Sequence, residues 1–154
     1  IAGACVREGI PVILDTAGNV EFALFTKVLP YLEACYFDLK SGTEEGYAYV
    51  GGQLRRTIDN FQAVAAAGVP VIARIPVIPG FNDSMESAEQ MMRVLAGIKV
   101  KRIDLLPFHR LGSGKYKALG KNYPYKDVPG RKPEQMKELL EKFRDSGFEV
   151  AVGG

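Results

Sequence analysis

The chain has 154 residues, 47% of them hydrophobic and 25% charged, which is typical of a globular protein with one core. Its formal net charge is only +2, so no overall field predicts a nucleic acid or a membrane as partner. No apolar run is long enough to span a bilayer and no signal segment opens the sequence, so a cytoplasmic location is expected. The chain begins at Ile1 without an initiator Met, and we expect one domain over residues 1–154 that is a piece of a longer protein.

Apolar residues recur with a helical period in four segments, which predicts helices over 22–32, 54–64, 84–95 and 133–143. Asn19 is placed to cap the first of these helices, and Asp83 is placed to cap the third. Pro133 suits the first turn of the last helix, where its missing N–H is not needed.

Strands are predicted between these helices, over 11–15, 34–39, 69–78, 101–107 and 148–152. They are nearly continuous apolar runs, which is typical of parallel strands covered on both faces, and their alternation with helices indicates an α/β fold. The pattern leaves a doubly wound sheet and part of a β/α barrel both open. A closed barrel usually needs ~250 residues, so about five β/α units would make a partial barrel with an exposed edge near Pro11. A missing N-terminal part would cover that edge.

Charged or titratable side chains stand at or near the carboxyl ends of the first four predicted strands. They are Asp15, Asp38, Lys40, Arg74 within a long strand, and His109, the only histidine. Because ligands bind at the carboxyl ends of parallel strands, these five residues are expected to form a mixed-charge site for a small molecule.

Each of the five also has a purely structural interpretation. Asp15 is a good turn or cap residue, and His109 suits an exposed turn. Asp38 and Lys40 are two positions apart, on one face of a strand, and could simply pair with each other. Arg74 is the hardest to explain in this way, because a charge inside an apolar strand requires a partner or water.

The two cysteines, Cys5 and Cys35, are thirty positions apart and have no second Cys or His at metal-ligand spacing. Both lie in apolar periodic segments, where a free Cys usually behaves as a small buried hydrophobic residue. Neither cysteine therefore indicates a metal site.

The segment from Arg110 to Lys132 holds seven basic residues and one acidic residue, with three tyrosines among them. Its Gly112-Ser113-Gly114-Lys115 run lacks the spacing of a phosphate-binding loop, and Tyr116 stands where Ser or Thr would bind magnesium. Such a segment is compatible with nucleic-acid binding, but no nucleic-acid-binding module surrounds it, so a solvated or partner-facing loop is favoured.

Six short motifs occur in order along nearly the whole chain, and together they resemble those of the pyruvate formate-lyase activating enzyme and related activating enzymes of glycyl radical enzymes. They are Asp15-Thr16-Ala17-Gly18, Phe37-Asp38-Leu39-Lys40, Tyr49-Val50-Gly51 with Asn60, Arg74-Ile75-Pro76-Val77-Ile78-Pro79-Gly80 with Asn82-Asp83, Leu105-Leu106-Pro107-Phe108-His109-Arg110-Leu111-Gly112 with Lys115-Tyr116, and Gly153-Gly154. The resemblance implies a partial barrel of the radical S-adenosylmethionine type. It also implies S-adenosylmethionine and a 4Fe–4S cluster as cofactors, and a glycyl radical enzyme as protein substrate.

The resemblance further implies roles for the five site residues. Asp38 and Lys40 would contact the ribose and the methionine carboxylate of S-adenosylmethionine, and His109 would face its methionyl part. Asp15 would lie close by, where a monovalent cation is implied near Asp15 and Asp38. Arg74 would point toward the cofactor or toward the glycine-bearing loop of the partner. The cofactor and cluster would carry the radical chemistry, and the protein would position and shield it.

The sequence lacks the family's three-cysteine cluster motif and the acidic-ended Gly-Gly motif, both of which precede these segments in the family. Cys5 and Cys35 do not have the spacing to replace the cluster motif. We therefore expect this chain alone to bind no cluster and to be inactive, as the C-terminal part of its parent protein. Which glycyl radical enzyme would be activated is not readable from the sequence.

Two other functions remain open at this stage. One is a non-catalytic binding domain that kept the barrel scaffold. The other is an aldolase-like enzyme with Lys40 as a Schiff-base amine, which is less favoured because Asp38 beside it stabilises the charged form of the lysine.

Overall fold

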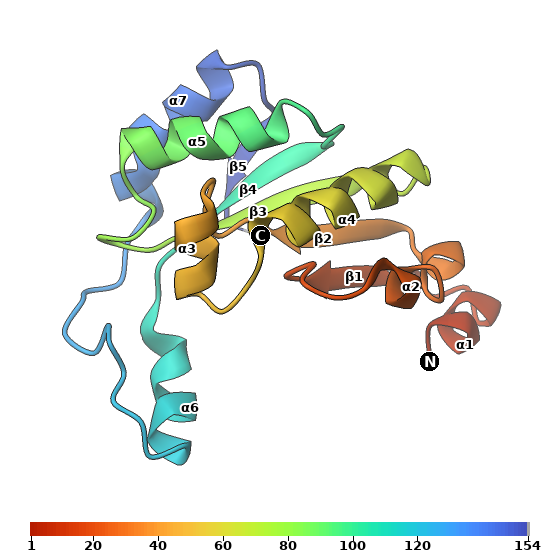
Figure 1. Cartoon of the computed structure of the whole chain (residues 1–154), viewed down its shortest axis with the longest axis horizontal. Coiled ribbons are helices and arrows are strands. Elements are labelled where there is room, and N and C mark those ends of the chain that lie inside the picture. The colour runs from red at the N-terminus through yellow and green to blue at the C-terminus, as the bar shows by residue number, and fades with distance from the viewer. Residues whose placement is uncertain (154) are drawn as a thin grey trace.

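The computed structural model describes residues 1–153, which form a single five-stranded parallel sheet with helices packed on it (Figure 1). The strands are β1 (Ile13–Thr16), β2 (Ala34–Asp38), β3 (Val71–Val77), β4 (Arg102–Pro107) and β5 (Val150–Val152). All five predicted strands are confirmed, each within two residues of its predicted limits. Gly154 of the closing Gly153-Gly154 motif lies outside the described residues.

The order of the strands in the sheet follows the order of the chain, β1-β2-β3-β4-β5, and every neighbouring pair is parallel. A doubly wound sheet reverses its strand order at a switch point. Since this sheet advances in one direction only, the architecture left open by the sequence is settled in favour of the partial β/α barrel.

The described helices are α1 (Ala2–Arg7), α2 (Phe22–Phe25), α3 (Glu44–Tyr49), α4 (Leu54–Ala66), α5 (Met85–Leu95), α6 (Ser113–Ala118) and α7 (Lys137–Asp145). Short 3₁₀ turns are η1 (Leu29–Tyr31), η2 (Arg110–Gly112) and η3 (Pro133–Met136). The helices predicted over 54–64 and 84–95 are confirmed, and Pro133 opens the turn that leads into α7. None of the helices in the described part of the chain is long and apolar enough to cross a bilayer.

Three details of the helix prediction are wrong. The segment 22–32 is not one helix: α2 ends at Phe25 and η1 begins with Pro30 in its first positions, because proline cannot donate the hydrogen bond that a continuing helix needs. Glu21 occupies the N-cap of α2, without a side-chain bond, in place of Asn19. Ser84 caps α5 in place of Asp83, and its hydroxyl accepts a hydrogen bond from the Ser87 N–H.

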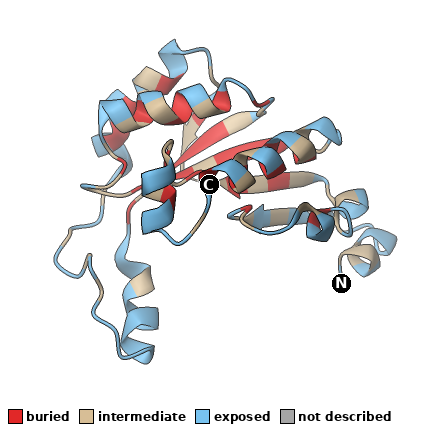
Figure 2. Cartoon of the chain, in the orientation of Figure 1, coloured by how far each residue is buried: buried red, intermediate tan, exposed pale blue. Residues whose placement is uncertain are grey.

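The two faces of the sheet differ in burial, as side-chain alternation along a strand requires (Figure 2). In β2, Cys35 and Phe37 are completely buried, whereas Tyr36 and Asp38 are only half-buried. The buried face packs against the helices in the core, where Phe37, Phe61 and Phe25 form an aromatic stack. Figure 1 shows α4 crossing in front of β3, and α5 lies against α7. We call the opposite side of the sheet the open face.

The sheet ends at β1, as predicted for the segment near Pro11. β1 pairs only with β2, and Ile13 on it keeps 48% of its surface exposed. An apolar edge strand of this kind is normally covered by another element, because its free N–H and C=O groups are otherwise a template for pairing.

A tight turn follows β1, and side chains of α4 hold it. The Asn60 amide donates hydrogen bonds of 2.7 Å to the carbonyl oxygens of Gly18 and Val20, and Asn60 itself is almost fully buried. Gly18 has a φ of +71°, and a Cβ atom at this position would lie 2.6 Å from the Phe37 ring. The turn after Asp15 therefore depends on a glycine both for its backbone conformation and for its close contact with the core.

We predict that Gly18→Ala lowers the free energy of unfolding by about 2–4 kcal/mol, because it adds a steric conflict with a packed ring to the strain of a left-handed residue. Gly9→Ala is the matched control, since Gly9 also has a φ of +71° but has no atom near the added methyl group. Urea denaturation of both variants measures the difference. Equal losses in the two variants would show that the contact with Phe37 is not a constraint.

Candidate functional site

The open face carries a row of charged residues that face one another across neighbouring strands. The sheet register sets Asp38 of β2 opposite Arg74 of β3, and Arg74 opposite Asp104 of β4. In the same register, Asp15 of β1 lies opposite Tyr36 of β2. Because directly opposed residues point to the same side of a sheet, all of these side chains lie on the open face.

Arg74 has the partner that a charge within an apolar strand requires. Its Nη1 donates to Asp15 Oδ2 at 2.5 Å, so the arginine reaches past β2 to the edge strand. Its guanidinium carbon lies 5.4 Å from the centre of the Tyr36 ring, within the range of a cation–π contact. The Nε of Arg74 is buried and makes no hydrogen bond among the described residues. The Arg74 side chain is 21% exposed, and Asp15 is its one hydrogen-bond acceptor among the described residues, so its remaining N–H groups are left for a further acceptor.

Asp38 and Lys40 form a second ion pair just beyond the end of β2, with 2.8 Å between Asp38 Oδ2 and Lys40 Nζ. The backbone at this point is fixed by Asn82, whose amide donates to the carbonyl oxygens of Lys40 and Pro76 at 2.9 and 2.8 Å. The Asn82 Oδ1 in turn accepts from the Ile78 N–H at 2.7 Å. The lysine and the loop after β3 are thus held together by one nearly buried amide.

Tyr47 of α3 lies beneath the same segment. Its hydroxyl donates to the carbonyl oxygen of Asp38 and accepts from the Lys40 N–H, both at 3.4 Å. Burial raises the pKa of Tyr47 to about 12, so the hydroxyl stays protonated and remains able to donate. Its role is to support the Asp38–Lys40 segment.

His109 follows β4, as predicted, but it stands apart from the two ion pairs. It is exposed and caps η2, where its Nδ1 accepts from the Leu111 N–H at 3.4 Å. Within residues 1–153, no hydrogen bond or ion pair joins His109 to Asp15, Asp38, Lys40 or Arg74. The structure thus brings four of the five predicted residues into two adjacent pairs and leaves the histidine at the rim.

The sequence interpretation missed a third pair on the open face. Arg102 binds Asp104 through two hydrogen bonds of 2.6 and 3.0 Å, and the Asp104 side chain is only 1% exposed. The carboxylate raises the pKa of the Arg102 guanidinium further above its usual value. The two residues have the same spacing as Asp38 and Lys40, but Arg102 opens β4, away from the carboxyl end of the strand at which site residues were expected.

Neither cysteine is suited to hold an iron–sulfur cluster in this part of the chain. Cys35 lies on the buried face of β2, facing the helices and away from Asp38, and burial, with a smaller effect of Asp15, raises the pKa of its thiol to about 12. Cys5 lies in α1 and is half-buried. No group of three His, Cys, Asp or Glu side chains in residues 1–153 is arranged to hold a metal ion.

The open face does fit a small zwitterionic ligand. It offers an ammonium group, a guanidinium with an unused donor and two partly exposed carboxylates, which are the groups that charged and hydroxyl-bearing ligands require. A hollow of about 670 Å³ between α5 and α7 is lined by none of these residues.

We predict that Arg102→Met destabilises the fold by about 2 kcal/mol, because it leaves the Asp104 carboxylate buried without its partner. Adding Asp104→Leu to the same chain should restore most of the loss, since no buried charge then remains. Urea unfolding of the two single variants and the double variant forms a double-mutant cycle. Simple addition of the two single effects would contradict the proposed pairing.

We also predict that iodoacetamide at about pH 8 labels Cys5 but not Cys35 in the folded chain, because only an accessible thiolate reacts. In concentrated urea both cysteines should be labelled, which mass spectrometry of the digested chain will show. Labelling of Cys35 at the rate of Cys5 under native conditions would contradict its placement in the core.

Comparison with known proteins identifies relatives of the kind that the sequence motifs predict. No protein-family model matches the sequence. The chain is 35% identical over 150 residues to the pyruvate formate-lyase 2-activating enzyme of Escherichia coli, an alignment that covers 95% of this chain and 50% of that protein. It is 31% identical to the pyruvate formate-lyase-activating enzyme of Clostridium pasteurianum, over 88% of this chain and 57% of the relative. The chain thus spans about half the length of the curated relatives it matches.

Solved structures show the same fold. A domain of a pyruvate-formate lyase-activating enzyme from Bacteroides vulgatus superposes with a TM-score of 0.79 at 22% identity, covering 99% of this chain and 87% of that one. A radical SAM methyltransferase from Sphaerobacter thermophilus gives 0.73 at 15% identity, over 95% of this chain and 42% of the other. SuiB of Streptococcus suis bound to S-adenosylmethionine gives 0.68 at 13% identity, over 99% of this chain and 34% of the other.

The structural matches establish the partial barrel found in radical S-adenosylmethionine proteins, and the sequence matches extend over nearly the whole chain at identities above 30%. The resemblance predicted from the motifs is therefore confirmed. Over nearly its whole length, the chain is similar to about half the length of each of the activating enzymes of pyruvate formate-lyases from Escherichia coli and Clostridium pasteurianum.

Proposed function

We propose that the chain is the S-adenosylmethionine-binding part of an activating enzyme that generates a glycyl radical on a partner enzyme. The observation that carries this proposal is the presence of two adjacent ion pairs, Asp15–Arg74 and Asp38–Lys40, on the open face near the carboxyl ends of β1, β2 and β3. Parallel α/β folds bind their ligands at this end of the strands.

The chemistry of the ligand matches the chemistry of the residues. S-adenosylmethionine carries a carboxylate, for which Lys40 is the cation, and ribose hydroxyls, for which Asp38 is the acceptor. His109 at the rim would face the methionyl part, and Asp15 would lie close to it. Arg74 would use its free donor on the cofactor or on the glycine-bearing loop of the partner. Charge-assisted hydrogen bonds of this kind contribute roughly 1.5–3 kcal/mol each.

The monovalent cation that the family resemblance implies would have to compete with side chains. Asp15 is paired with Arg74, and Asp38 is paired with Lys40. A cation could join the two carboxylates only if ligand binding drew Arg74 or Lys40 away from them. Binding of the methionine carboxylate to Lys40 is a change that would release Asp38 in this way.

The proposal places the 4Fe–4S cluster in a part of the parent protein outside the 154 residues. This chain would be the C-terminal part of the radical S-adenosylmethionine barrel, inactive by itself, and the cluster-binding part would pack against the exposed edge of β1. Two observations support this arrangement: the apolar edge at Ile13, and the fact that the relatives are about twice as long as the chain. The cluster and S-adenosylmethionine together would supply the radical chemistry in the whole protein.

The protein substrate would be a glycyl radical enzyme similar to pyruvate formate-lyase. This part of the proposal rests on the two relatives described above, which are activating enzymes of pyruvate formate-lyases. The residues of this chain would bind and orient the cofactor and exclude water from it, while the broad open face would admit a loop of the partner.

We predict that Lys40→Ala weakens S-adenosylmethionine binding by roughly tenfold or more, because the methionine carboxylate loses its cation. Isothermal titration calorimetry measures the affinity, and nuclear magnetic resonance shift mapping shows where the ligand binds. Lys27→Ala is the control, since Lys27 is exposed and lies away from the strand ends. Equal affinities for the parent chain and both variants would contradict the assignment. Chemical-shift changes confined to the helices and the buried face of the sheet would also contradict it.

A further inference from the structure

Positive charge is concentrated in one segment of the chain. Residues 110–132 contain seven of the twenty Lys and Arg residues and one of the eighteen Asp and Glu residues. The remaining thirteen basic and seventeen acidic residues give the rest of the molecule a net charge of −4. The modest overall charge therefore hides a strongly basic segment on an acidic body, and a field of this kind acts over a Debye length on a charged partner.

This segment forms an arm that projects from the sheet beyond β4 and carries α6 (Figure 1). We define the basic arm as residues 108–132. It contributes only Phe108 to the buried residues, and α6 buries none of its side chains. Figure 2 shows α6 and the loop after it mostly in the colour of exposed residues. Packing of the core therefore does not explain the composition of the arm.

The base of the arm is fixed by specific contacts. The Arg131 N–H donates to the Phe108 carbonyl oxygen at 2.9 Å, which closes the arm where it leaves and rejoins the body. The Arg131 guanidinium also pairs with Asp83 in the loop before α5. Arg110 donates to the carbonyl oxygen of Lys126 across the arm at 3.1 Å. The arm is thus attached as a defined unit, with His109 at its base.

Aromatic rings support the arm from inside. Tyr116 packs on Tyr123 with 5.0 Å between ring centres, Tyr123 on Tyr125 at 6.0 Å, and Tyr125 on Phe108 at 5.6 Å. Burial, together with a hydrogen bond to Tyr49 of α3, raises the pKa of Tyr125 to about 12. The tyrosines are used to hold the arm together.

The outward side of the arm presents lysines and two leucines. Lys115, Lys117 and Lys121 are exposed and form no ion pair in the described part of the chain. Leu111 and Leu119 keep 82% and 70% of their surface exposed, the largest exposed values of any leucine in the molecule. Free cations beside bare apolar side chains suit a surface that is covered by a partner which is both acidic and apolar.

We infer that the basic arm is a docking surface for an acidic segment of the partner protein that also carries apolar side chains. The rim residue His109 lies at the base of the arm, directly after β4, so a segment bound to the arm would be delivered to the mouth of the open face. That the partner is the protein substrate rests on the proposed function, whereas the docking surface itself rests on the charges, the leucines and the ordered base of the arm.

A protein segment fits the arm better than a nucleic acid does. Single-stranded nucleic acids bind by stacking bases on exposed aromatic faces. In the arm the three tyrosine rings pack on one another and on Phe108, and Tyr123 and Tyr125 are half-buried. Tyr116 is 37% exposed, whereas the aliphatic Leu111 and Leu119 are 82% and 70% exposed, and these leucines match apolar side chains of a peptide.

The test uses fluorescence anisotropy with three labelled probes of equal charge: a peptide of glutamate and leucine, a peptide with serine in place of each leucine, and an oligothymidylate. The parent chain should bind the glutamate–leucine peptide most tightly. The triple variant Lys115→Glu, Lys117→Glu, Lys121→Glu should lose roughly tenfold in affinity, since each exposed pair contributes modestly and three are reversed. Leu111→Ser with Leu119→Ser should weaken the leucine peptide only.

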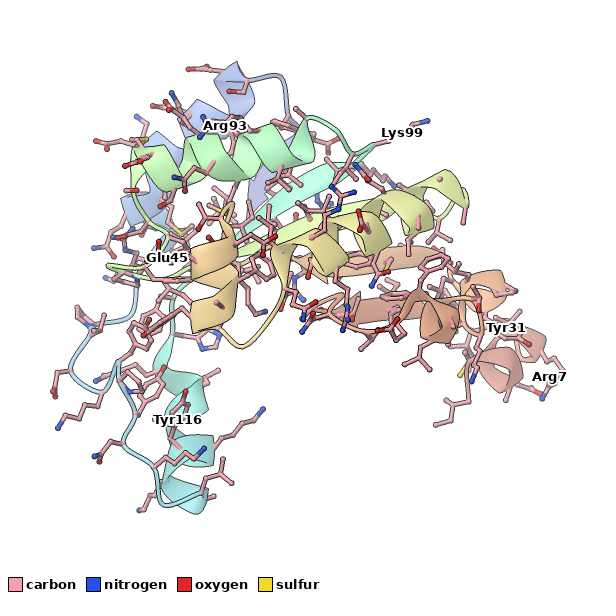
Figure 3. The ribbon with its side chains drawn as sticks, viewed as in Figure 1. Arg7, Tyr31, Glu45, Arg93, Lys99 and Tyr116 are labelled. Atoms are coloured by element: carbon pink, nitrogen blue, oxygen red, sulfur yellow. The ribbon has the colours of Figure 1, made fainter. Side chains whose placement is uncertain are left out.

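The matched control reverses three exposed lysines elsewhere, Lys27→Glu, Lys99→Glu and Lys101→Glu. It has the same net charge as the arm variant, and Figure 3 shows Lys99 on the opposite side of the molecule from Tyr116 of α6. The arm variant alone should lose affinity for the peptide. Equal losses in the two variants would overturn the proposal, because they would indicate a general charge effect. Tightest binding of the oligothymidylate, with no effect of the leucine substitutions, would overturn the proposal in favour of a nucleic acid.

The docking proposal and the proposed function fail separately in this design. All arm variants should keep the thermal unfolding temperature and the S-adenosylmethionine affinity of the parent chain, because none of the replaced side chains is buried or faces the open face. Peptide binding without cofactor binding would refute the proposed function and leave the docking surface standing. Cofactor binding without peptide binding would refute the docking surface and leave the proposed function standing.

Discussion

The ion pair between Arg74 and Asp15 is the interaction on which the arrangement of the open face depends. A guanidinium in the middle of a strand costs several kcal/mol unless a partner compensates it. The partner lies two strands away, so β1, β2 and β3 must keep their order and register for the pair to form. Tyr36, on the strand between them, lies beneath the guanidinium. One face of the sheet is thereby committed to polar contacts, and the hydrophobic core is confined to the other.

The residues of the six sequence motifs have two different physical roles. Asp38, Lys40 and Arg74 present charge to the open face, whereas Asn60 and Asn82 are buried and bind backbone carbonyl groups. The two asparagines act in the same way at β1 and β2: each connects the loop that follows one of these strands to a later element of the chain through hydrogen bonds. A long charged side chain can be directed to one point only when its backbone is held in place, and the two asparagines provide this support.

Much of this architecture was readable in the sequence because the signals were local. Continuous apolar runs bounded by glycine predicted the strands, and the charged residues at their ends predicted the site. The order of the strands was not readable, since hydrophobic periodicity describes an element but not its neighbours. The helix over 22–32 was overpredicted because its apolar period continues past Pro30, where the backbone hydrogen bonding cannot. Arg102 and Asp104 were missed because each alone resembles a surface residue, and only the register shows that they share a face with Arg74.

The one-directional order of the strands also bears on how the chain reaches its fold. Every pairing in the sheet joins strands that are consecutive in the sequence, so no step requires two distant segments to meet before the units between them have formed. Each pairing closes only the connection between two consecutive strands, so the entropic cost of loop closure is spread over successive units. A molecule assembled in this way grows like a stack of repeats, in which each added unit needs only the surface of the one before it. This gives a physical reason why part of a barrel can hold a complete hydrophobic core of its own.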